Sequence, residues 1–331
     1  MHADDTLAAR VVSVEALTPQ IKTFRLVAAD GGKLPGYSPG AHVQVQVPAA
    51  PGRREGVHWR SYSLVNFDVD ADTRCDVAEY RIAVRREDTG RGGSRFMHEE
   101  LQRGDTLTLR RPLNYFPLAE PPEAILLAGG IGITPMVSMA TALMAQRRAF
   151  QLHYSGRSRA QLAFVDELRA VVGERLHVHV DDEPQDKLSI EALLAASDPQ
   201  QPIYVCGPAG MIDATLQVAE RLGWPKSAVH YELFTEAQPL AGDQPFEVEL
   251  QSSGRTISVP ADRSLLDALT EAGADVMSDC RSGYCGLCST RVCSGDIEHR
   301  DTYLSDAEKA SGQVMQVCVS RARSGRLVLD L

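Results

Sequence analysis

The chain has 331 residues, 44% of them hydrophobic, and a net charge of −10, a composition typical of a folded protein with two or three domains. A surface with this excess of acids repels phosphates, so we expect no nucleic-acid partner. No apolar run approaches the roughly 18 residues of a membrane-spanning helix, and the N-terminal residues are acidic where a signal peptide would be basic and then apolar. We therefore expect a cytoplasmic protein without a membrane segment, whose thiols stay reduced.

Residues 1–117 are predicted to form an antiparallel β-barrel. Stretches of β-type alternation at 9–15, 21–26 and 42–47 are separated by turns rich in glycine and proline, as in strands joined by hairpins. Residues 105–110 have the pattern of a closing strand. This pattern distinguishes the first part of the chain from the α/β pattern that follows it.

The strand after these hairpins contains Arg60-Ser61-Tyr62-Ser63. A guanidinium can bind a phosphate through two hydrogen bonds, an aromatic side chain can lie along a flat ring, and a hydroxyl can hydrogen-bond a ring nitrogen. The same residues could also be an exposed strand with an incidental arginine. The segment resembles the flavin signature of the ferredoxin reductase superfamily. That resemblance assigns Arg60 to the flavin phosphate and Ser61 to the flavin site, with Tyr62 and Ser63 beside the isoalloxazine.

A second part of the predicted flavin site follows the strand at 80–85. The segment Gly90-Arg91-Gly92-Gly93-Ser94 stands before a predicted helix at 95–101, and its consecutive amides could form a phosphate-binding nest. The alternative is a plain glycine-rich turn, but we favour the nest because Arg60 is expected nearby. The predicted flavin contacts here are Ala83, Val84, Arg85, Arg91, Gly92, Gly93 and Ser94.

Residues 118–237 have the pattern of a nucleotide-binding α/β domain. The apolar run 124–128 is followed by Gly129-Gly-Ile-Gly-Ile-Thr-Pro-Met136 and a helical pattern through 147, an order that places a pyrophosphate at a helix N-terminus. A well-capped helix, with Thr134 as the N-cap and Pro135 in the first turn, is the structural alternative. The segment resembles the superfamily's pyridine-nucleotide motif, which assigns NAD contacts to Gly130, Gly132, Thr134 and Pro135; Thr134 is also a predicted flavin contact.

The second strand of this domain, 150–155, ends just before Arg157 and Arg159. In such folds this strand end lies beside the adenosine ribose. The two arginines could bind the 2′-phosphate of NADPH, with Arg157 as the predicted contact, or they could be solvated charges in an NADH enzyme.

A later buried strand, 203–206, ends in Cys206-Gly207-Pro208. This segment resembles the superfamily's C-G-P motif, which lies against the nicotinamide. We expect Cys206 to pack beside the reactive carbon, because no neighbouring residue has the pattern of an activating base. The domain ends with a strand at 229–234, where the resemblance places Phe234 by the flavin; an ordinary apolar strand end is the alternative.

Residues 238–245 lack periodicity and contain two prolines and a glycine, which predicts a linker between domains. Beyond it, strands at 246–250 and 256–259, a helix at 264–272 and a final strand at 327–331 have the order of a β-grasp fold.

The most specific pattern in the chain is the spacing of four of its seven cysteines, Cys280, Cys285, Cys288 and Cys318. C-x4-C-x2-C with a distant fourth cysteine is the plant-type ferredoxin spacing for a [2Fe-2S] cluster. Gly283 and Gly286 allow the sharp bends that such a loop needs. A disulfide set fits poorly with an odd number of cysteines, and a zinc site would more often use paired C-x2-C knuckles. Cys75, Cys206 and Cys293 fall outside the pattern, and residues 246–331 resemble a plant-type ferredoxin domain.

The order of these motifs resembles the phthalate dioxygenase reductase and vanillate demethylase reductase family. The implied fold is multidomain: an antiparallel β-barrel flavin domain, a Rossmann-like α/β NAD domain and a β-grasp ferredoxin domain. The implied cofactors are FMN rather than FAD, because the nest leaves no obvious place for an adenylate, together with NADH rather than NADPH and a [2Fe-2S] cluster. Nicotinamide gives two electrons as hydride and a cluster accepts one, so a flavin is needed between them.

The same resemblance implies the reductase component of a two-component Rieske non-haem iron oxygenase, acting in aromatic degradation or demethylation. Ser63, Thr134 and Cys206 are predicted to shape the hydride-transfer step. A reductase for a different acceptor, such as a ferredoxin, a cytochrome or a quaternary-amine oxygenase, would share every motif. A redox sensor is a further alternative, and a monomer would suffice for the chemistry.

Overall fold

The computed structural model describes residues 6–48, 57–88, 92–119, 123–234 and 237–331. The chain divides into two compact units, Met1–Glu232 and Leu233–Leu331, which are described separately below. No helix in the described ranges is both long enough and apolar enough to cross a membrane.

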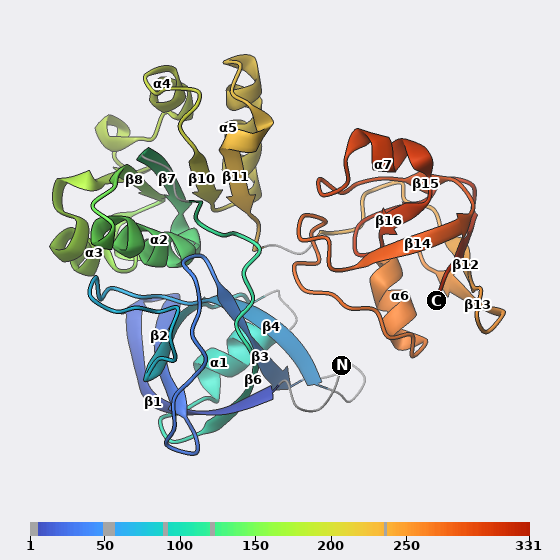
Figure 1. The fold of residues 1–331 in the computed structure, drawn as a ribbon, viewed down its shortest axis with the longest axis horizontal. Coiled ribbons are helices and arrows are strands. Elements are labelled where there is room, and N and C mark those ends of the chain that lie inside the picture. The colour runs from blue at the N-terminus through green and yellow to red at the C-terminus, as the bar shows by residue number, and fades with distance from the viewer. Residues whose placement is uncertain (1–5, 49–56, 89–91, 120–122, 235–236) are drawn as a thin grey trace. The chain divides into compact units, whose positions relative to one another are not determined.

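The first half of unit one is a six-stranded antiparallel sheet in the order β4-β3-β6-β1-β2-β5 (Figure 1). An antiparallel bridge between Leu64, after β4, and Ile82 in β5 joins the two ends of the order, so the sheet closes into a barrel. Its strands and helix are β1 (Thr6–Thr18), β2 (Ile21–Ala28), β3 (His42–Pro48), β4 (Val57–Ser63), β5 (Glu79–Arg85), α1 (Gly93–Glu99) and β6 (Thr106–Arg110).

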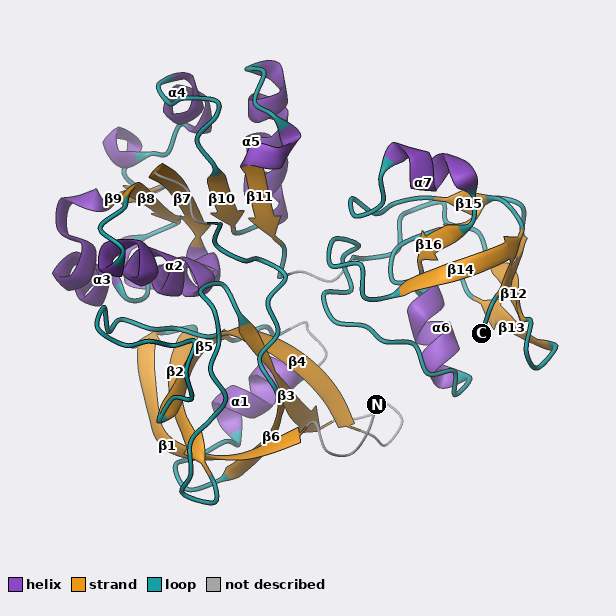
Figure 2. Cartoon of the chain, in the orientation of Figure 1, coloured by secondary structure: helices purple, strands orange, loops and turns teal. Residues whose placement is uncertain are grey.

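The second half of unit one is a parallel sheet in the order β11-β10-β7-β8-β9. Helix α2 packs on β7, β8 and β10, and α5 packs on β10 and β11 (Figures 1 and 2). The elements are β7 (Glu123–Gly129), α2 (Ile133–Ala145), β8 (Ala149–Gly156), α3 (Val165–Val172), β9 (Leu176–Val180), α4 (Ile190–Ala195), β10 (Ile203–Cys206), α5 (Ala209–Arg221) and β11 (Val229–Glu232). The central strands β7 and β10 are almost wholly buried, as expected for a sheet covered on both faces.

Several element boundaries differ from the predicted ones. Helix α1 begins two residues earlier than predicted, directly after Gly92, whose φ of 90° marks the turn into the helix. Helix α2 ends at Ala145, although the helical pattern of the sequence continues through residue 147. Arg147 has a φ of 54°, a left-handed conformation that ends the helix. The last strand of the unit ends at Glu232 rather than at residue 234.

The barrel and the parallel sheet are joined by direct contacts within unit one. The Arg81 guanidinium lies 5.2 Å from the ring centroid of Phe67 and 4.9 Å from that of Phe164. It also forms an ion pair with Glu167 at 3.1 Å. Gly40 donates its N–H to Ser138 Oγ of α2 at 3.2 Å, and a Cβ on Gly40 would lie 2.8 Å from Cε of Met139 in the same helix, so the barrel approaches α2 closely there. These contacts hold the strand with the flavin signature and the nucleotide motifs in one body.

Unit two is a five-stranded mixed sheet in the order β13-β12-β18-β14-β16, with a helix packed on it. Strands β12 and β18 are parallel, and the other neighbours are antiparallel. The elements are β12 (Phe246–Leu250), β13 (Arg255–Val259), α6 (Leu265–Glu271), β14 (Ser289–Ser294), β15 (Ile297–Glu298), α7 (Asp306–Ser311), β16 (Val314–Gln316), β17 (Arg321–Ala322) and β18 (Arg326–Leu329). Helix α6 buries Leu265, Leu266 and Leu269 in the core. The predicted β-grasp order of hairpin, helix and final strand is therefore confirmed.

The predicted linker at 238–245 lies within unit two, and residues in it and just before it make specific contacts there. Ala237 donates its backbone N–H to the carbonyl oxygen of Arg281 at 3.1 Å. Asp243 accepts two hydrogen bonds from Arg300, at 2.6 and 3.0 Å, and its side chain is only 4% exposed. Arg321, also 4% exposed, lies 3.7 Å from the same carboxylate. The predicted boundaries at 117/118 and 237/238 remain predictions.

This buried ion pair makes the stability of unit two depend on pH. Hydrogen bonds from Arg300 hold the pKa of Asp243 below its usual range. The stabilisation is therefore complete above the unfolded pKa of about 4 and is lost as the pH falls towards the folded pKa. We expect Asp243→Asn to destabilise unit two by about 3 kcal/mol at neutral pH, because it leaves buried guanidinium charge uncompensated.

Urea unfolding followed by circular dichroism at a series of pH values measures this effect. The difference between Asp243→Asn and the unchanged protein should shrink below about pH 4. Asp330→Asn is the matched control, because Asp330 forms an exposed pair with Arg291 at 3.7 Å. An equal loss of stability in both variants would contradict the role of Asp243.

Candidate functional sites

The loop between α6 and β14 carries Cys280, Cys285 and Cys288, and the turn after β16 brings Cys318 to them. Cys288 and Cys318 are buried, and Cys280 and Cys285 are partly buried. The pKa of Cys280 is lowered, because the thiols of Cys285 and Cys318 hydrogen-bond its sulfur. The pKa of Cys318 is raised, because its thiol hydrogen-bonds the sulfurs of Cys280 and Cys288. Hydrogen bonds thus link Cys280 to Cys285 and Cys318, and Cys318 to Cys288, and four cysteine sulfurs are the donor set that a [2Fe-2S] cluster requires.

Backbone amides of the loop point at these sulfurs. Ser282 donates its N–H to the Cys280 sulfur at 3.4 Å. The amide of Tyr284 also hydrogen-bonds Cys280, and the amide of Leu287 hydrogen-bonds Cys285. Such donors stabilise the negative charge that thiolates carry when they hold iron.

Two glycines give the loop the shape that aims these amides. Gly283 has a φ of 78° and Gly286 a φ of 77°, a conformation that favours glycine. A Cβ on Gly286 would lie 2.2 Å from the Tyr303 ring, and one on Gly283 would lie 2.8 Å from Val319. The cysteines, the amides and the glycines thus fit a [2Fe-2S] cluster together.

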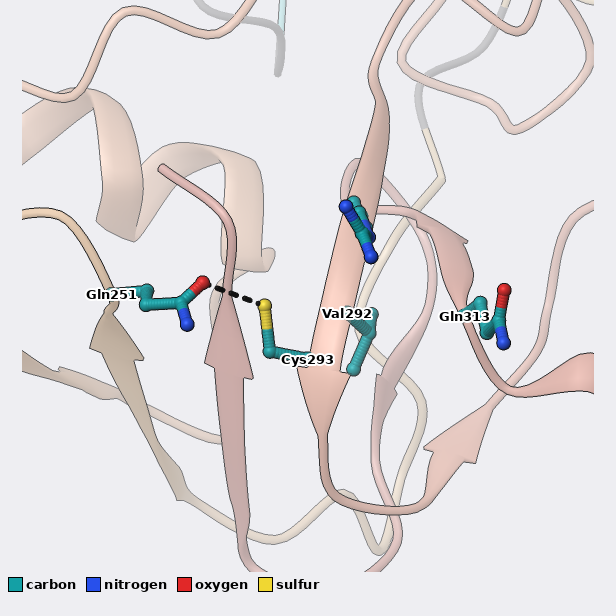
Figure 3. A pocket seen from close by; sticks show the side chains of 5 residues that line it. Gln251, Val292, Cys293 and Gln313 are labelled. Carbon is teal, nitrogen blue, oxygen red and sulfur yellow. Dashed lines mark hydrogen bonds between the residues drawn. The ribbon is translucent and has the colours of Figure 1, made fainter.

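The cysteines outside the spacing pattern have other surroundings. Cys75 is exposed and hydrogen-bonds Asp72 at 3.3 Å. Cys293 is also exposed and donates to Gln251 at 3.0 Å, at the wall of a surface pocket that Val292 and Gln313 help to line (Figure 3).

In the barrel, Arg60 lies against the glycine-rich turn before α1. A Cβ on Gly93 would lie 2.9 Å from Cγ of Arg60, and Gly92 has the left-handed conformation of a nest residue. Ser94 accepts a hydrogen bond from the Glu87 backbone at 3.0 Å. The structure thus brings together an arginine and a turn with the features expected of a phosphate site. Arg91 lies outside the described residues.

The end of β4 presents the predicted ring contacts. Ser63 is 3% exposed, and among the described residues its Oγ has no hydrogen-bond partner. A buried hydroxyl without a partner is costly, so this atom fits a hydrogen bond to a bound ring. Burial raises the pKa of Tyr62, which keeps its hydroxyl neutral.

The other predicted flavin contacts in strands β4 and β5 differ in how exposed they are. Ser61 is exposed and pairs with Gln44 of β3. Ala83 and Val84 are buried, whereas Arg85 is exposed and forms an ion pair with Glu87 at 2.9 Å. The bridge between Leu64 and Ile82 sets the end of β4 beside these β5 residues.

The two nucleotide motifs lie in direct contact at the carboxyl ends of β7 and β10. A Cβ on Gly132 would lie 2.1 Å from the carbonyl oxygen of Cys206, and one on Gly129 would lie 2.6 Å from Pro208. A Cβ on Gly207 would lie 3.1 Å from the Gly129 backbone. The glycines therefore allow the two turns to pack backbone on backbone.

The start of α2 differs from the capped helix that the sequence allowed as an alternative. Gly130 has a φ of 55° and opens a 3₁₀ turn, and Gly132 is the N-cap. Thr134 lies inside the helix, 1% exposed, and donates to the Ile131 carbonyl at 3.0 Å. Pro135 is in the first turn as predicted. Thr134 is not the N-cap, because the glycine turn already forms the helix start.

Cys206 is fully buried at the end of β10, where it pairs with Ala128 and Glu232 of the neighbouring strands. Burial raises the pKa of its thiol, with a further contribution from Glu232. A neutral, buried thiol is a packing group rather than a nucleophile; the place of Cys206 beside the nicotinamide stays a prediction.

The arginines after β8 have different partners. Arg157 is exposed and forms no ion pair with the described residues. Arg159 donates two hydrogen bonds to Glu183, at 2.6 and 2.8 Å, and a third to Asp186 at 2.7 Å. Sequence reasoning missed this carboxylate pair. The acidic run after β9, which begins at Asp181, is the signal that could have indicated it.

Phe234 is 44% exposed and belongs to the second unit. Its predicted place by the flavin therefore remains a prediction.

Comparison with known proteins agrees with these sites. Residues 248–323 match the family model of the 2Fe-2S iron-sulfur cluster binding domain, and residues 126–217 match that of the oxidoreductase NAD-binding domain. The heme-dependent oxidative N-demethylase beta subunit of Ectopseudomonas mendocina is 42% identical, over 98% of this chain and 99% of that protein. The vanillate O-demethylase oxidoreductase of a Pseudomonas species is 40% identical, over 97% and 99%.

A solved structure shows the same architecture over the whole chain. Phthalate dioxygenase reductase, described as a modular structure for electron transfer from pyridine nucleotides to [2Fe-2S], is 38% identical with a TM-score of 0.74. The match covers 99% of this chain and 98% of that one. The predicted order of barrel, NAD-binding domain and ferredoxin domain is therefore confirmed, and the chain belongs to the phthalate dioxygenase reductase family.

Proposed function

We propose that the protein is the NADH-dependent reductase component of a multicomponent oxygenase. One observation carries this proposal: a four-sulfur loop occurs in the same chain as two nucleotide-binding turns and a strand with the flavin signature. When bound, a flavin takes up the two electrons of a hydride together and releases them singly to a [2Fe-2S] cluster. The solved relative, described as transferring electrons from pyridine nucleotides to [2Fe-2S], supports a pyridine nucleotide and a [2Fe-2S] cluster as cofactors, and we propose that the nucleotide is NADH and the flavin FMN.

The chain's own residues position the reactants. The turns at Gly132 and Cys206 form the wall against which the nicotinamide binds, and the neutral thiol and Thr134 shape that wall. Arg60 and the turn at Gly92 would bind the flavin phosphate, and the Ser63 hydroxyl would donate to the flavin ring. No side chain would need to act as a general acid or base, because a hydride would pass directly from the nicotinamide ring to the flavin ring.

We infer that the electrons go to a terminal Rieske-type oxygenase in a transient complex. A haem-containing component is the second candidate, because the 42% identical relative is a subunit of a heme-dependent demethylase. A monomer suffices, since each site is formed by one chain, and a cytoplasmic location suits a cluster held by reduced thiols. Supplying purified components of both classes with NADH and this protein, and measuring product, distinguishes the two acceptors.

Removal of a cluster ligand should separate two activities. Cys285→Ala is expected to lose more than about 90% of NADH-dependent cytochrome c reduction, because a protein acceptor takes electrons from the cluster. Reduction of ferricyanide, a small acceptor that can meet the flavin, should stay within about twofold. Cys293→Ala is the control and should retain both activities. If Cys285→Ala keeps both activities, the proposed route from flavin through the cluster is contradicted.

The coenzyme preference should depend on the carboxylates that bind Arg159. Glu183 and Asp186 neutralise this guanidinium, so a 2′-phosphate would meet net negative charge at this strand end. The double variant Glu183→Gln, Asp186→Asn frees Arg159 and should raise the ratio of kcat/KM for NADPH to that for NADH about 10-fold. Steady-state kinetics with both coenzymes measures the ratio.

The matched control is Glu191→Gln, which removes a carboxylate from an exposed pair with Arg221. It should leave the ratio unchanged. An unchanged ratio in the double variant as well would show that these carboxylates do not select the coenzyme.

A further inference from the structure

A buried glutamine side chain contacts one of the four cluster cysteines. Gln316 is fully buried at the end of β16, and the sulfur of Cys288 lies 3.3 Å from its Oε1. Its Nε2 donates to Ser289 Oγ at 2.6 Å. The strand register sets Ser289 opposite Gln316. The amide is therefore held between a cysteine sulfur and the hydroxyl of the next residue.

The present direction of this hydrogen bond requires a thiol. Cys288 donates its S–H to the Gln316 carbonyl oxygen. A Cys288 thiolate that holds iron has no proton to donate, and a carbonyl oxygen beside it would be repelled. A half-turn of the carboxamide exchanges its oxygen and nitrogen with almost no change of shape. An N–H of the Gln316 side chain then points at the Cys288 sulfur, so the buried amide still has a hydrogen-bond partner there.

The hydroxyl of Ser289 can accommodate the turned amide. It now donates to the carbonyl oxygen of Gly286 at 2.7 Å. That carbonyl also accepts the backbone N–H of Ser289 at 3.1 Å, so it keeps a partner when the hydroxyl rotates. The hydroxyl proton can then pass to Oε1 of Gln316. Both ends of the amide are satisfied in the cluster-bound form.

We propose that Gln316 is a positioning residue that donates an N–H···S hydrogen bond to Cys288 and raises the reduction potential of the cluster. This inference rests on the [2Fe-2S] site of the proposed function. Reduction adds one negative charge to the cluster, and a buried donor at a ligand sulfur stabilises that charge more strongly than a solvated one. Gln316 thereby favours electron transfer from flavin to cluster.

The test is a redox titration with mediators, in which the EPR signal of the reduced cluster is measured. Gln316→Met keeps the length and fits an apolar site but has no donor. At a fixed ambient potential it should lower the ratio of reduced to oxidised cluster about tenfold, which equals about 59 mV for one electron. Gln313→Met is the control, because Gln313 is an exposed glutamine of the same segment, and it should titrate like the unchanged protein.

A second variant keeps the proposal testable if Gln316→Met fails to hold a cluster. Ser289→Ala removes the group that satisfies the turned amide, and it should shift the ratio about two- to threefold in the same direction. The role of Gln316 is overturned if the clusters of both variants titrate as in the unchanged protein. If Gln316→Met holds no cluster, an unchanged titration of Ser289→Ala alone overturns it. An unchanged protein without any [2Fe-2S] signal would instead refute the proposed function itself.

Discussion

Four sulfurs in contact inside a small domain can all be thiolates only if their negative charge is compensated. Unit two is arranged around this constraint. Iron supplies most of the compensation when bound, and the chain supplies the rest through amides that point at the sulfurs. The left-handed conformations of Gly283 and Gly286 aim those amides, and the buried Gln316 adds a side-chain donor at Cys288. The short β-grasp sheet serves mainly to hold this loop and the distant Cys318 in register.

Unit one meets a different requirement, the close approach of two flat rings. Its two nucleotide turns pack backbone on backbone, which only glycine allows at Gly129 and Gly132. Gly40 allows a similarly close approach between the barrel and Met139 of α2. A side chain at any of these places would push apart parts of the chain that now lie in contact. The glycines therefore contribute to function through distance rather than through chemistry.

The sequence predicted the parts whose signal is local. The spacing of the cysteines indicated the cluster loop, and the apolar run before Gly129 indicated a buried parallel strand. What it could not predict depends on partners far apart in the chain. Arg159 is bound by carboxylates 24 and 27 residues away in the chain. The sequence therefore could not predict that its charge is neutralised. Asp243 looked like part of a free linker, because its partner Arg300 is 57 residues distant. The alternative in which Thr134 caps the helix is not the one the structure adopts, since a capping hydroxyl and a glycine turn satisfy the same amides and Gly132 is the N-cap.

Anaerobic titration of the purified protein with NADH tests the central claim most directly. The flavin and the cluster are followed by visible absorbance and by low-temperature EPR. If electrons pass from NADH through the flavin to the cluster, the protein takes up about three electrons, the flavin absorbance bleaches and a rhombic [2Fe-2S] signal appears. Bleaching of the flavin without any cluster signal would show that the ferredoxin domain does not receive these electrons, which would contradict the account.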